Sequence, residues 1–71
     1  MFEIDNLNDG YVVKEPYHAI REAGEPTRYY PTHYVMSYRK GVYKYTTDYT
    51  YAKRFTKATA RKHADTLNER S

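Results

Sequence analysis

The sequence of 71 residues contains no cysteine and no tryptophan, and it has only three glycines and three prolines. Without cysteine, the chain has no disulfide framework, no thiolate zinc site and no thiol nucleophile. Its apolar runs are far shorter than the ~18 residues of a transmembrane helix, and residues 1–10 are acidic, unlike a secretory signal peptide. We therefore expect a soluble, cytoplasmic protein that does not associate with membranes.

Large aliphatic side chains are also scarce. Leu, Ile, Val and Phe make up about 14% of the residues, below the ~20% at which a strongly charged chain usually stays disordered. Ten tyrosines compensate, because each buried ring contributes a large apolar area with one polar tip. The formal net charge of +3 is modest, so self-repulsion does not keep the chain open. The composition predicts one small folded domain with an aromatic, amphipathic core.

Charge is divided unevenly along the chain. Residues 1–26 have a net charge of −4, whereas residues 27–71 have a net charge of +7. The two parts could attract each other within the fold, or the acidic part could compete with an acidic ligand for the basic part. A third interpretation is that both parts are simply solvated surface.

The first half of the chain predicts an arm, a strand and a loop. We interpret residues 1–9 as an acidic arm, either flexible or docked onto the fold, that closes with a turn. β-branched and aromatic residues then predict an extended segment over residues 11–20, which Pro16 confines to a sheet edge or interrupts. Residues 22–27 are expected to form a loop, and Pro31 favours an extended conformation before the next strand.

Residues 32–47 carry the clearest structural signal. With Lys40-Gly41 as a two-residue hairpin turn, Tyr38 lies opposite Tyr43 and the alternation agrees on both strands. We expect the tyrosine-rich face to be buried, because a shift of one residue would move all its large side chains to the other side. That face carries Tyr34, Met36, Tyr38, Tyr43 and Tyr45, and the other carries His33, Val35, Ser37, Arg39, Val42, Lys44 and Thr46.

Thr56 is the predicted N-cap of a helix over residues 57–70. Ala60, Ala64 and Leu67 follow at positions i, i+4 and i+7, which gives a narrow apolar stripe. The small side chains of this stripe allow the helix to lie close to a sheet.

Together these elements predict an α+β fold in a single domain, residues 1–71. A small antiparallel sheet is formed by the hairpin of residues 32–47 and the N-terminal strand of residues 11–20, and it packs against one C-terminal helix. Residues 49–55 are expected to form a helical turn or a short strand.

Residues typical of catalytic and metal sites are poorly represented. His18, His33 and His63 are too far apart in the sequence to give a recognised metal-ligand spacing. Asp65 and Glu69 are spaced i, i+4 on the predicted helix and offset neighbouring basic charges. A chain this small rarely encloses a water-free pocket. We therefore expect no enzyme activity, no metal and no cofactor.

Five basic residues occur within ten positions, without an acidic residue among them: Lys53, Arg54, Lys57, Arg61 and Lys62. Those in the first turns of the predicted helix have the charge that the helix dipole disfavours there. A helix start surrounded by Lys and Arg suits a phosphate or carboxylate group. Alternatively, tertiary packing makes the helix tolerate this charge order. Arg39 and Lys40, near the predicted turn, join these candidates for partner or anion binding.

Ten tyrosines are more than a core of this size can bury, so some must be exposed. Tyr29 and Tyr30 are further candidates for partner binding. Tyr and Arg anchor protein interfaces, and Tyr beside Lys or Arg also stacks on single-stranded nucleic acid. The alternative is that tyrosine replaces the missing Leu and Ile as packing material.

A family resemblance rests on the motifs Thr46-Thr47-Asp48 and Ala52-Lys53-Arg54-Phe55, followed by an alanine-rich helix. The order of these motifs along residues 32–68 resembles that in small ββα accessory proteins encoded by bacteriophages and prophages. The resemblance implies a phage accessory role, such as binding and modulating a host protein or nucleic acid, and it carries over no catalytic residues. The preferred interpretation is a non-catalytic inhibitor or modulator of a host protein or protein complex in the host cytoplasm. The alternative is a small basic protein that binds DNA or RNA through its Lys/Arg cluster and exposed tyrosines. The partner and the oligomeric state stay open.

Overall fold

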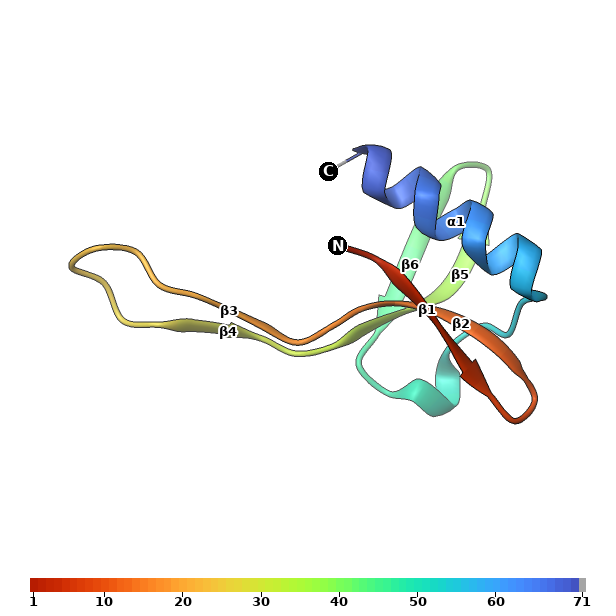
Figure 1. Cartoon of the computed structure of the whole chain (residues 1–71), viewed down its shortest axis with the longest axis horizontal. Coiled ribbons are helices and arrows are strands. Elements are labelled where there is room, and N and C mark those ends of the chain that lie inside the picture. Colours follow the sequence, from red (N-terminus) through yellow and green to blue (C-terminus); the bar gives the residue numbers. More distant parts are fainter. Residues whose placement is uncertain (71) are drawn as a thin grey trace.

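The computed structural model describes residues 1–70 and has an α+β fold (Figure 1). An antiparallel sheet in the order β1-β2-β5-β6 contains β1 (Glu3–Leu7), β2 (Gly10–Glu15), β5 (His33–Arg39) and β6 (Val42–Thr46). A second sheet pairs β3 (His18–Ile20) with β4 (Arg28–Tyr30). The 3₁₀ turn η1 (Tyr49–Tyr51) precedes α1 (Lys57–Arg70). The predicted fold class and the predicted helix are confirmed.

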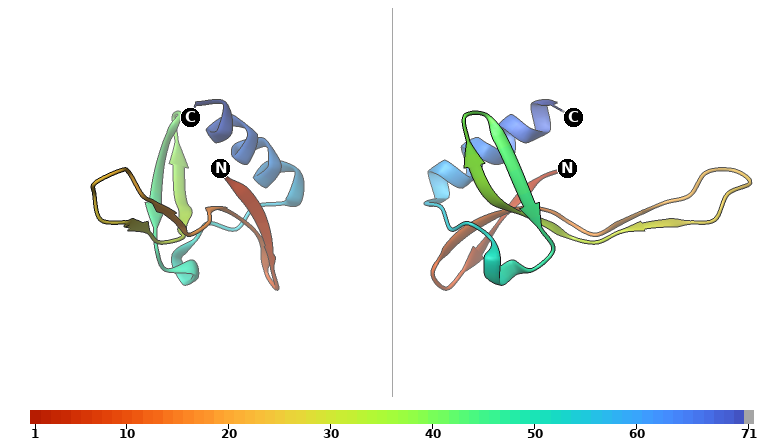
Figure 2. Two further views of the ribbon diagram at one scale, coloured as in Figure 1. Left: turned by 60° about the vertical axis from the view of Figure 1, so that its left-hand side comes forward. Right: turned by 180° about the vertical axis from the view of Figure 1, so that it is seen from behind.

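Helix α1 packs across β1 and β2 and buries the predicted apolar stripe (Figure 2). The core beneath the stripe consists of Val13 and Val35, which are both fully buried. The cap is also as expected, since the backbone N–H of Thr59 donates to Oγ1 of Thr56 over 3.3 Å. The core is therefore made of small aliphatic side chains, and Phe2, Tyr43 and other partly buried residues surround it.

The turn between β5 and β6 follows the predicted register. Arg39 pairs with Val42 across Lys40 and Gly41. The two turn residues have φ angles of 51° and 81°, which is the pattern of a type I′ turn. This turn matches the right-handed twist of the two strands, and glycine at the second position meets its demand for a positive φ.

A β-bulge in β5 overturns the predicted burial of this hairpin. The register shifts between Val35 and Ser37, so Val35 and not Met36 lies opposite Tyr45. An extra residue on one strand turns the side chains beyond it to the other face. Val35 therefore takes the buried place predicted for Met36, which is 39% exposed. Tyr38, Tyr43 and Tyr45 stay on the predicted face toward α1, but α1 covers this face only in part, so Tyr38 and Tyr45 are about 40% exposed. The prediction that the whole tyrosine-rich face is buried is wrong. Tyr34 and Tyr43 are half-buried, as are His33 and Ser37 from the face that was expected to be polar.

Residues 3–7 lie in the segment that was expected to be an acidic arm, but they form the edge strand β1. It pairs with β2 along its whole length, from Glu3 opposite Lys14 to Leu7 opposite Gly10. Gly10 has a φ of +145°, and a Cβ there would lie 3.1 Å from Cβ of Arg54, so the close approach requires glycine.

The predicted extended segment of residues 11–20 exists as β2 and β3, and Pro16 separates the two strands. Glu15 pairs with His33 at the end of one ladder, and His18 pairs with Tyr30 at the start of the next, in the same register. The strands β2 to β5 are therefore one long hairpin whose ladder is interrupted near its middle.

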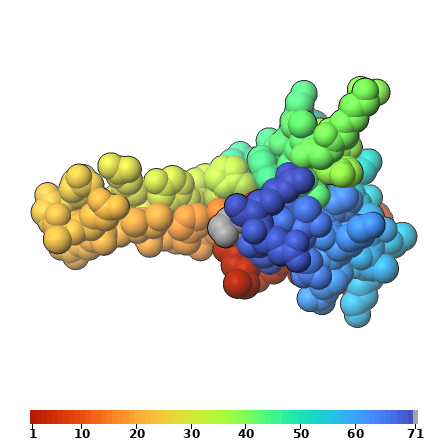
Figure 3. Space-filling view, turned by 90° about the horizontal axis from the view of Figure 1, so that it is seen from above, coloured from red at the N-terminus to blue at the C-terminus, as the bar shows by residue number. Residues whose placement is uncertain are grey.

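The outer part of this hairpin, residues 16–32, projects from the rest of the molecule (Figures 1, 2 and 3). From here on, the arm means this segment and not residues 1–9. The predicted loop of residues 22–27 forms its tip. The molecule measures 43 × 25 × 17 Å, and its radius of gyration is 13.3 Å, against roughly 11 Å for a compact chain of this length. We call the remaining sheet and α1 the body.

Candidate interaction surface

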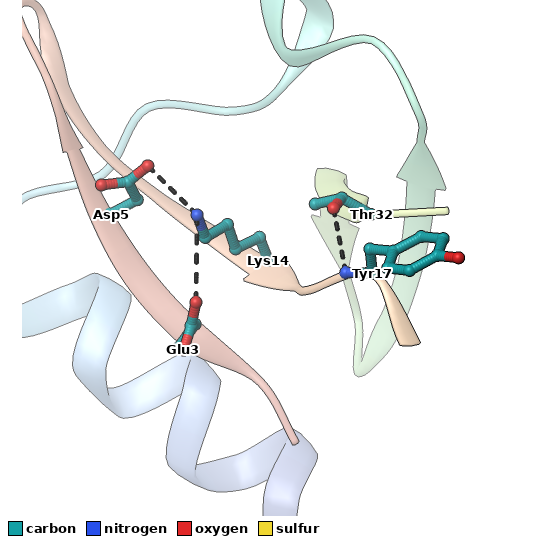
Figure 4. Close-up of polar contacts among 5 residues, drawn as sticks. All are labelled: Glu3, Asp5, Lys14, Tyr17 and Thr32. Atoms are coloured by element: carbon teal, nitrogen blue, oxygen red, sulfur yellow. Dashed lines mark hydrogen bonds and ion pairs between the residues drawn. The ribbon is translucent and has the colours of Figure 1, made fainter. Parts of the chain in front are cut away.

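The base of the arm is marked by two prolines, Pro16 and Pro31, one on each strand of the hairpin. Proline has no backbone N–H, so neither residue can donate a ladder hydrogen bond. Instead, the backbone N–H of Tyr17 donates to Oγ1 of Thr32 over 3.0 Å (Figure 4). A side-chain hydrogen bond thus joins the two strands where the backbone ladder is broken.

On the body side of this joint, β2 is anchored to β1 by charge. Nζ of Lys14 lies 3.3 Å from a carboxylate oxygen of Asp5 and 3.9 Å from one of Glu3 (Figure 4). Cross-strand pairs of opposite charge stabilise a sheet by ~0.2–1 kcal/mol each. The arm therefore extends from a strand that is paired on both sides within the body.

The arm carries exposed aromatic side chains on both faces. Opposite residues share a face and neighbours alternate, so the first face has His18 and Tyr30, whose rings stack with centroids 5.0 Å apart. The second face has Tyr17 and Tyr29, whose rings stack with centroids 6.2 Å apart. Tyr29 is 65% exposed and Tyr17 is 58% exposed. Neither the sheet nor α1 covers these rings.

The remaining side chains of the arm balance in charge. Ile20 adds a further exposed apolar group beside Tyr30 on the first face. Around the tip lie two arginines and two glutamates, and Arg28 pairs with Glu25 over 3.5 Å. The arm therefore presents aromatic and aliphatic groups with no net charge.

The basic cluster predicted from the sequence is partly neutralised by the fold. Nε of Arg54 donates to Oδ1 of Asp9 over 2.8 Å. Nη1 of Arg54 donates to the backbone oxygens of Tyr49 and Ala52 over 3.1 and 2.6 Å. Arg54 therefore holds the β1–β2 turn and the η1 segment together. This contact also shows that the acidic N-terminal part does attract the basic part, through Arg54.

The other cations of the cluster do not converge. Lys53 lies with Nζ 5.9 Å from the ring centre of Phe55. Lys57 and Arg61 lie one turn apart on α1, whereas Lys62 points to a different side of the helix. This start of α1 lies at the end of the body away from the arm (Figures 1 and 2).

The remaining predicted site residues fall in two further places. Arg39 and Lys40 lie at the exposed tip of the β5–β6 hairpin. Tyr29 and Tyr30 lie in β4 on the arm. The nine candidates therefore do not form one surface. Sequence reasoning left out Tyr17, His18 and Ile20, although two prolines at similar distances from the loop of residues 22–27 were a usable signal for a projecting hairpin.

An aromatic cluster joins the middle of α1 to the β5–β6 hairpin. The hydroxyl of Tyr43 lies 2.7 Å from Nδ1 of His63, and the ring of Tyr38 lies 4.7 Å from that of His63. Burial lowers the pKa of His63, and the positive charges of Lys62 and Lys53 lower it further. Burial raises the pKa of the Tyr43 hydroxyl. The pair is therefore uncharged at neutral pH and packs as a structural contact.

A shallow groove lies beside this cluster, near the end of α1. It is lined by Phe2, Tyr43, Tyr45, Leu67 and Arg70. Arg70 is already engaged, because Nη1 donates to the backbone oxygen of Gly41 over 3.1 Å and the guanidinium lies 5.5 Å from the Tyr43 ring centre.

Within residues 1–70, no three His, Asp or Glu side chains are grouped so that they could hold a metal ion. No helix in this described part of the chain has the length and apolar character to cross a membrane.

Comparisons with known proteins do not place the chain in a family. No family model matches it, and neither a curated protein nor a solved structure matches it.

Proposed function

We propose that this chain is a non-catalytic binding protein that recognises another protein through its arm. The observation that carries the proposal is the pair of aromatic ring stacks on a hairpin that projects from the body; Tyr17, Tyr29 and Tyr30 are exposed and His18 is half-buried. Exposed apolar groups are usual as single residues, whereas a contiguous group of them marks an interaction site. Tyrosine is also among the residues that contribute most to protein interfaces.

The charge of the arm favours a protein partner over a nucleic acid. Binding of DNA or RNA depends on several cations placed along the phosphate backbone. The arm has no net charge, and in the basic cluster Arg54 is already paired with Asp9. A nucleic-acid role would need the remaining cations to act from separate positions, so it is the second candidate.

We extend this proposal to a specific form on the basis of the resemblance to phage accessory proteins, which covers residues 32–68 of the body and not the arm. In this form, a bacteriophage protein inhibits or modulates a complex of its bacterial host by occupying a surface of that complex. The arm would supply the contact, and the body would hold the arm in position.

The test compares matched tyrosine variants in a pull-down from bacterial extract. Tyr29 on the arm and Tyr51 on the body are similarly exposed, at 65% and 68%. We expect the wild type and Tyr51→Ser to retain the same host protein after nuclease treatment, and Tyr29→Ser to lose it. If retention instead requires nucleic acid, the second candidate is favoured.

The nucleic-acid alternative has its own readout. It predicts measurable binding of DNA or RNA at low salt, with a log–log salt slope of about −0.9 for each duplex phosphate neutralised. It also predicts that the double variant Lys57→Glu, Arg61→Glu abolishes binding while Tyr29→Ser at most weakens it. Nucleic-acid binding with this pattern would reject the arm as the recognition element.

A further inference from the structure

We propose that the partner protein encloses the arm, so that two walls of an uncharged cleft cover the two faces of the hairpin. This inference rests on the proposed function, because it specifies how the arm is bound. The first observation is that both faces carry a stacked ring pair: Tyr17 with Tyr29 on one face and His18 with Tyr30 on the other. A flat partner surface would cover one pair and leave the other in water.

The second observation is that no other element within residues 1–70 lies alongside the arm (Figures 1 and 2). It extends along the longest axis of the molecule, and Figure 3 shows it standing clear of the body. A two-stranded hairpin without a covering layer is only marginally stable in water. Enclosure would supply the missing layers on both faces at once.

The third observation concerns the chemistry of the walls. The two arginines and two glutamates of the arm cancel, and one pair, Arg28 and Glu25, already forms an ion pair. Charge complementarity therefore selects uncharged walls rather than an acidic or basic surface. The hydroxyls of the exposed tyrosines require polar partners when the rings are buried. The walls must accordingly be apolar where they cover the rings, with hydrogen-bonding groups near the tyrosine hydroxyls, and the cleft must be open at the tip of the arm so that its four charged side chains stay in water.

Other occupants fit these observations less well. A second copy related by two-fold symmetry would bring the same face of each arm together and leave the opposite faces exposed. A lipid bilayer would have to accommodate the four charged side chains around the tip, which is costly. A polyanion would find no net positive charge on the arm.

The test places the photo-crosslinking residue p-benzoylphenylalanine at single positions of the full chain in bacterial cells. Tyr30 and Ile20 report on the first face, Tyr29 reports on the second face, and Tyr51 on the body is the control. We expect both faces to crosslink to one host polypeptide, at two separate segments of that polypeptide, and the control to give no such product. Thermal unfolding of each substituted protein checks that the body remains folded.

Each other outcome has a defined meaning. Crosslinks from only one face would overturn enclosure and leave a flat docking mode of the same partner. Crosslinks from the arm to a second copy of the chain would overturn it in favour of self-association. Crosslinks from the body control alone, or none from the arm of a folded protein, would reject enclosure together with the proposed function.

Affinity measurements with the crosslinked host protein provide a second readout. Tyr29→Ser and Tyr30→Ser should each weaken binding at least about tenfold, because a buried aromatic anchor is lost from each wall. A loss confined to one of the two variants would overturn enclosure. Tyr49→Ser on the body is the matched control and should leave the affinity unchanged.

Discussion

Arg54 and Asp9 form an ion pair with a distance of 2.8 Å between Nε and Oδ1, and they join segments that lie 45 positions apart in the sequence. The guanidinium also donates to two backbone oxygens of the η1 segment. One residue of the basic cluster thus connects the β1–β2 turn to the segment that leads into α1.

The ion pair predicts a stability difference that depends on pH. The hydrogen bond from Arg54 lowers the pKa of Asp9 below its usual value, which is about 3.9. A lowered pKa means that the carboxylate stabilises the fold above pH ~4 and that this contribution is lost as the pH falls through the lowered pKa. We expect Asp9→Asn to melt at a lower temperature than the wild type at pH 7 and at the same temperature in strong acid.

The control for this prediction is Asp65→Asn, an exposed acidic residue on α1. It should change the melting temperature little at either pH. Equal melting temperatures of Asp9→Asn and the wild type at pH 7 would show that the ion pair does not contribute to stability.

The bulge in β5 predicts opposite outcomes for two neighbouring residues. Val35 is fully buried, and Met36 is 39% exposed. Val35→Ala should lower the free energy of unfolding by about 2 kcal/mol, since it removes two buried methyl groups and leaves a cavity. Met36→Ala should change it by no more than ~0.5 kcal/mol. Urea unfolding followed by circular dichroism measures both free energies. A larger loss for Met36→Ala than for Val35→Ala would show that β5 alternates strictly and has no bulge.

The exposure of Tyr38 predicts a small cost for the removal of its ring. A fully buried ring would contribute about 3 kcal/mol, but this ring is 42% exposed and contacts mainly Tyr43 and His63. Its truncation is therefore closer to the loss of an aromatic pair, ~0.5–1.5 kcal/mol.

The helix and the β5–β6 turn could be predicted from the sequence because their signals are local. Thr56 caps the first turn, the stripe of Ala60, Ala64 and Leu67 has helical spacing, and Lys40-Gly41 fits a tight turn. Each of these features depends on residues that are close together in the chain.

The bulge and the arm could not be predicted because they depend on contacts between distant segments. The alternation of side chains in β5 is compatible with a regular strand and with a bulged strand. The fold selects the bulged strand because it places Val35 in the core, where the helix packs above β2. Likewise, β1 is a strand because β2 has a free edge beside it, not because its own acidic sequence favours one. The sequence singled out two residues of the proposed interaction site, Tyr29 and Tyr30, whereas the basic residues that dominated the sequence signal lie elsewhere.

His63 predicts a second pH effect in a different range. Burial and the charges of Lys62 and Lys53 lower its pKa, from about 6.5 in the unfolded chain. The unfolded state therefore binds the proton more tightly, so stability is full above pH ~6.5 and falls as the pH drops towards the lowered pKa. We expect the melting temperature of the wild type to decrease between pH 7 and pH 5 and that of His63→Gln to change less. Parallel melting curves of the two proteins over this range would contradict the assignment.

Thr32 at the base of the arm predicts a change in mobility without a change in the body. Thr32→Val removes the acceptor for the backbone N–H of Tyr17, so the strands on either side of the prolines lose their side-chain link. Amide hydrogen exchange should become faster in β3 and β4, while exchange in β2 and β5 stays as in the wild type. Thr32→Ser keeps a hydroxyl and is the control. Unchanged exchange in the arm of Thr32→Val would show that the hydrogen bond does not hold the joint.

Lys57 predicts a gain in stability from the removal of positive charge at the start of α1. The first turn of the helix contains no acidic residue in the described chain, and Lys57 lies four positions before Arg61. Lys57→Glu places a negative charge at the positive end of the helix dipole and creates a favourable i, i+4 pair with Arg61. The dipole interaction is worth roughly 0.3–1 kcal/mol at an exposed site and the i, i+4 pair roughly 0.2–0.5 kcal/mol, so the melting temperature should rise. Lys62→Glu, which lies beyond the first turn, should raise it less. Lys57 is the first residue of α1, and the start of α1 lies at the end of the body away from the arm (Figure 1). Binding of the partner proposed for the arm should therefore be unchanged. A loss of binding would return the basic cluster to the candidate interaction surface, and a loss of stability would show that Lys57 already has an acidic partner.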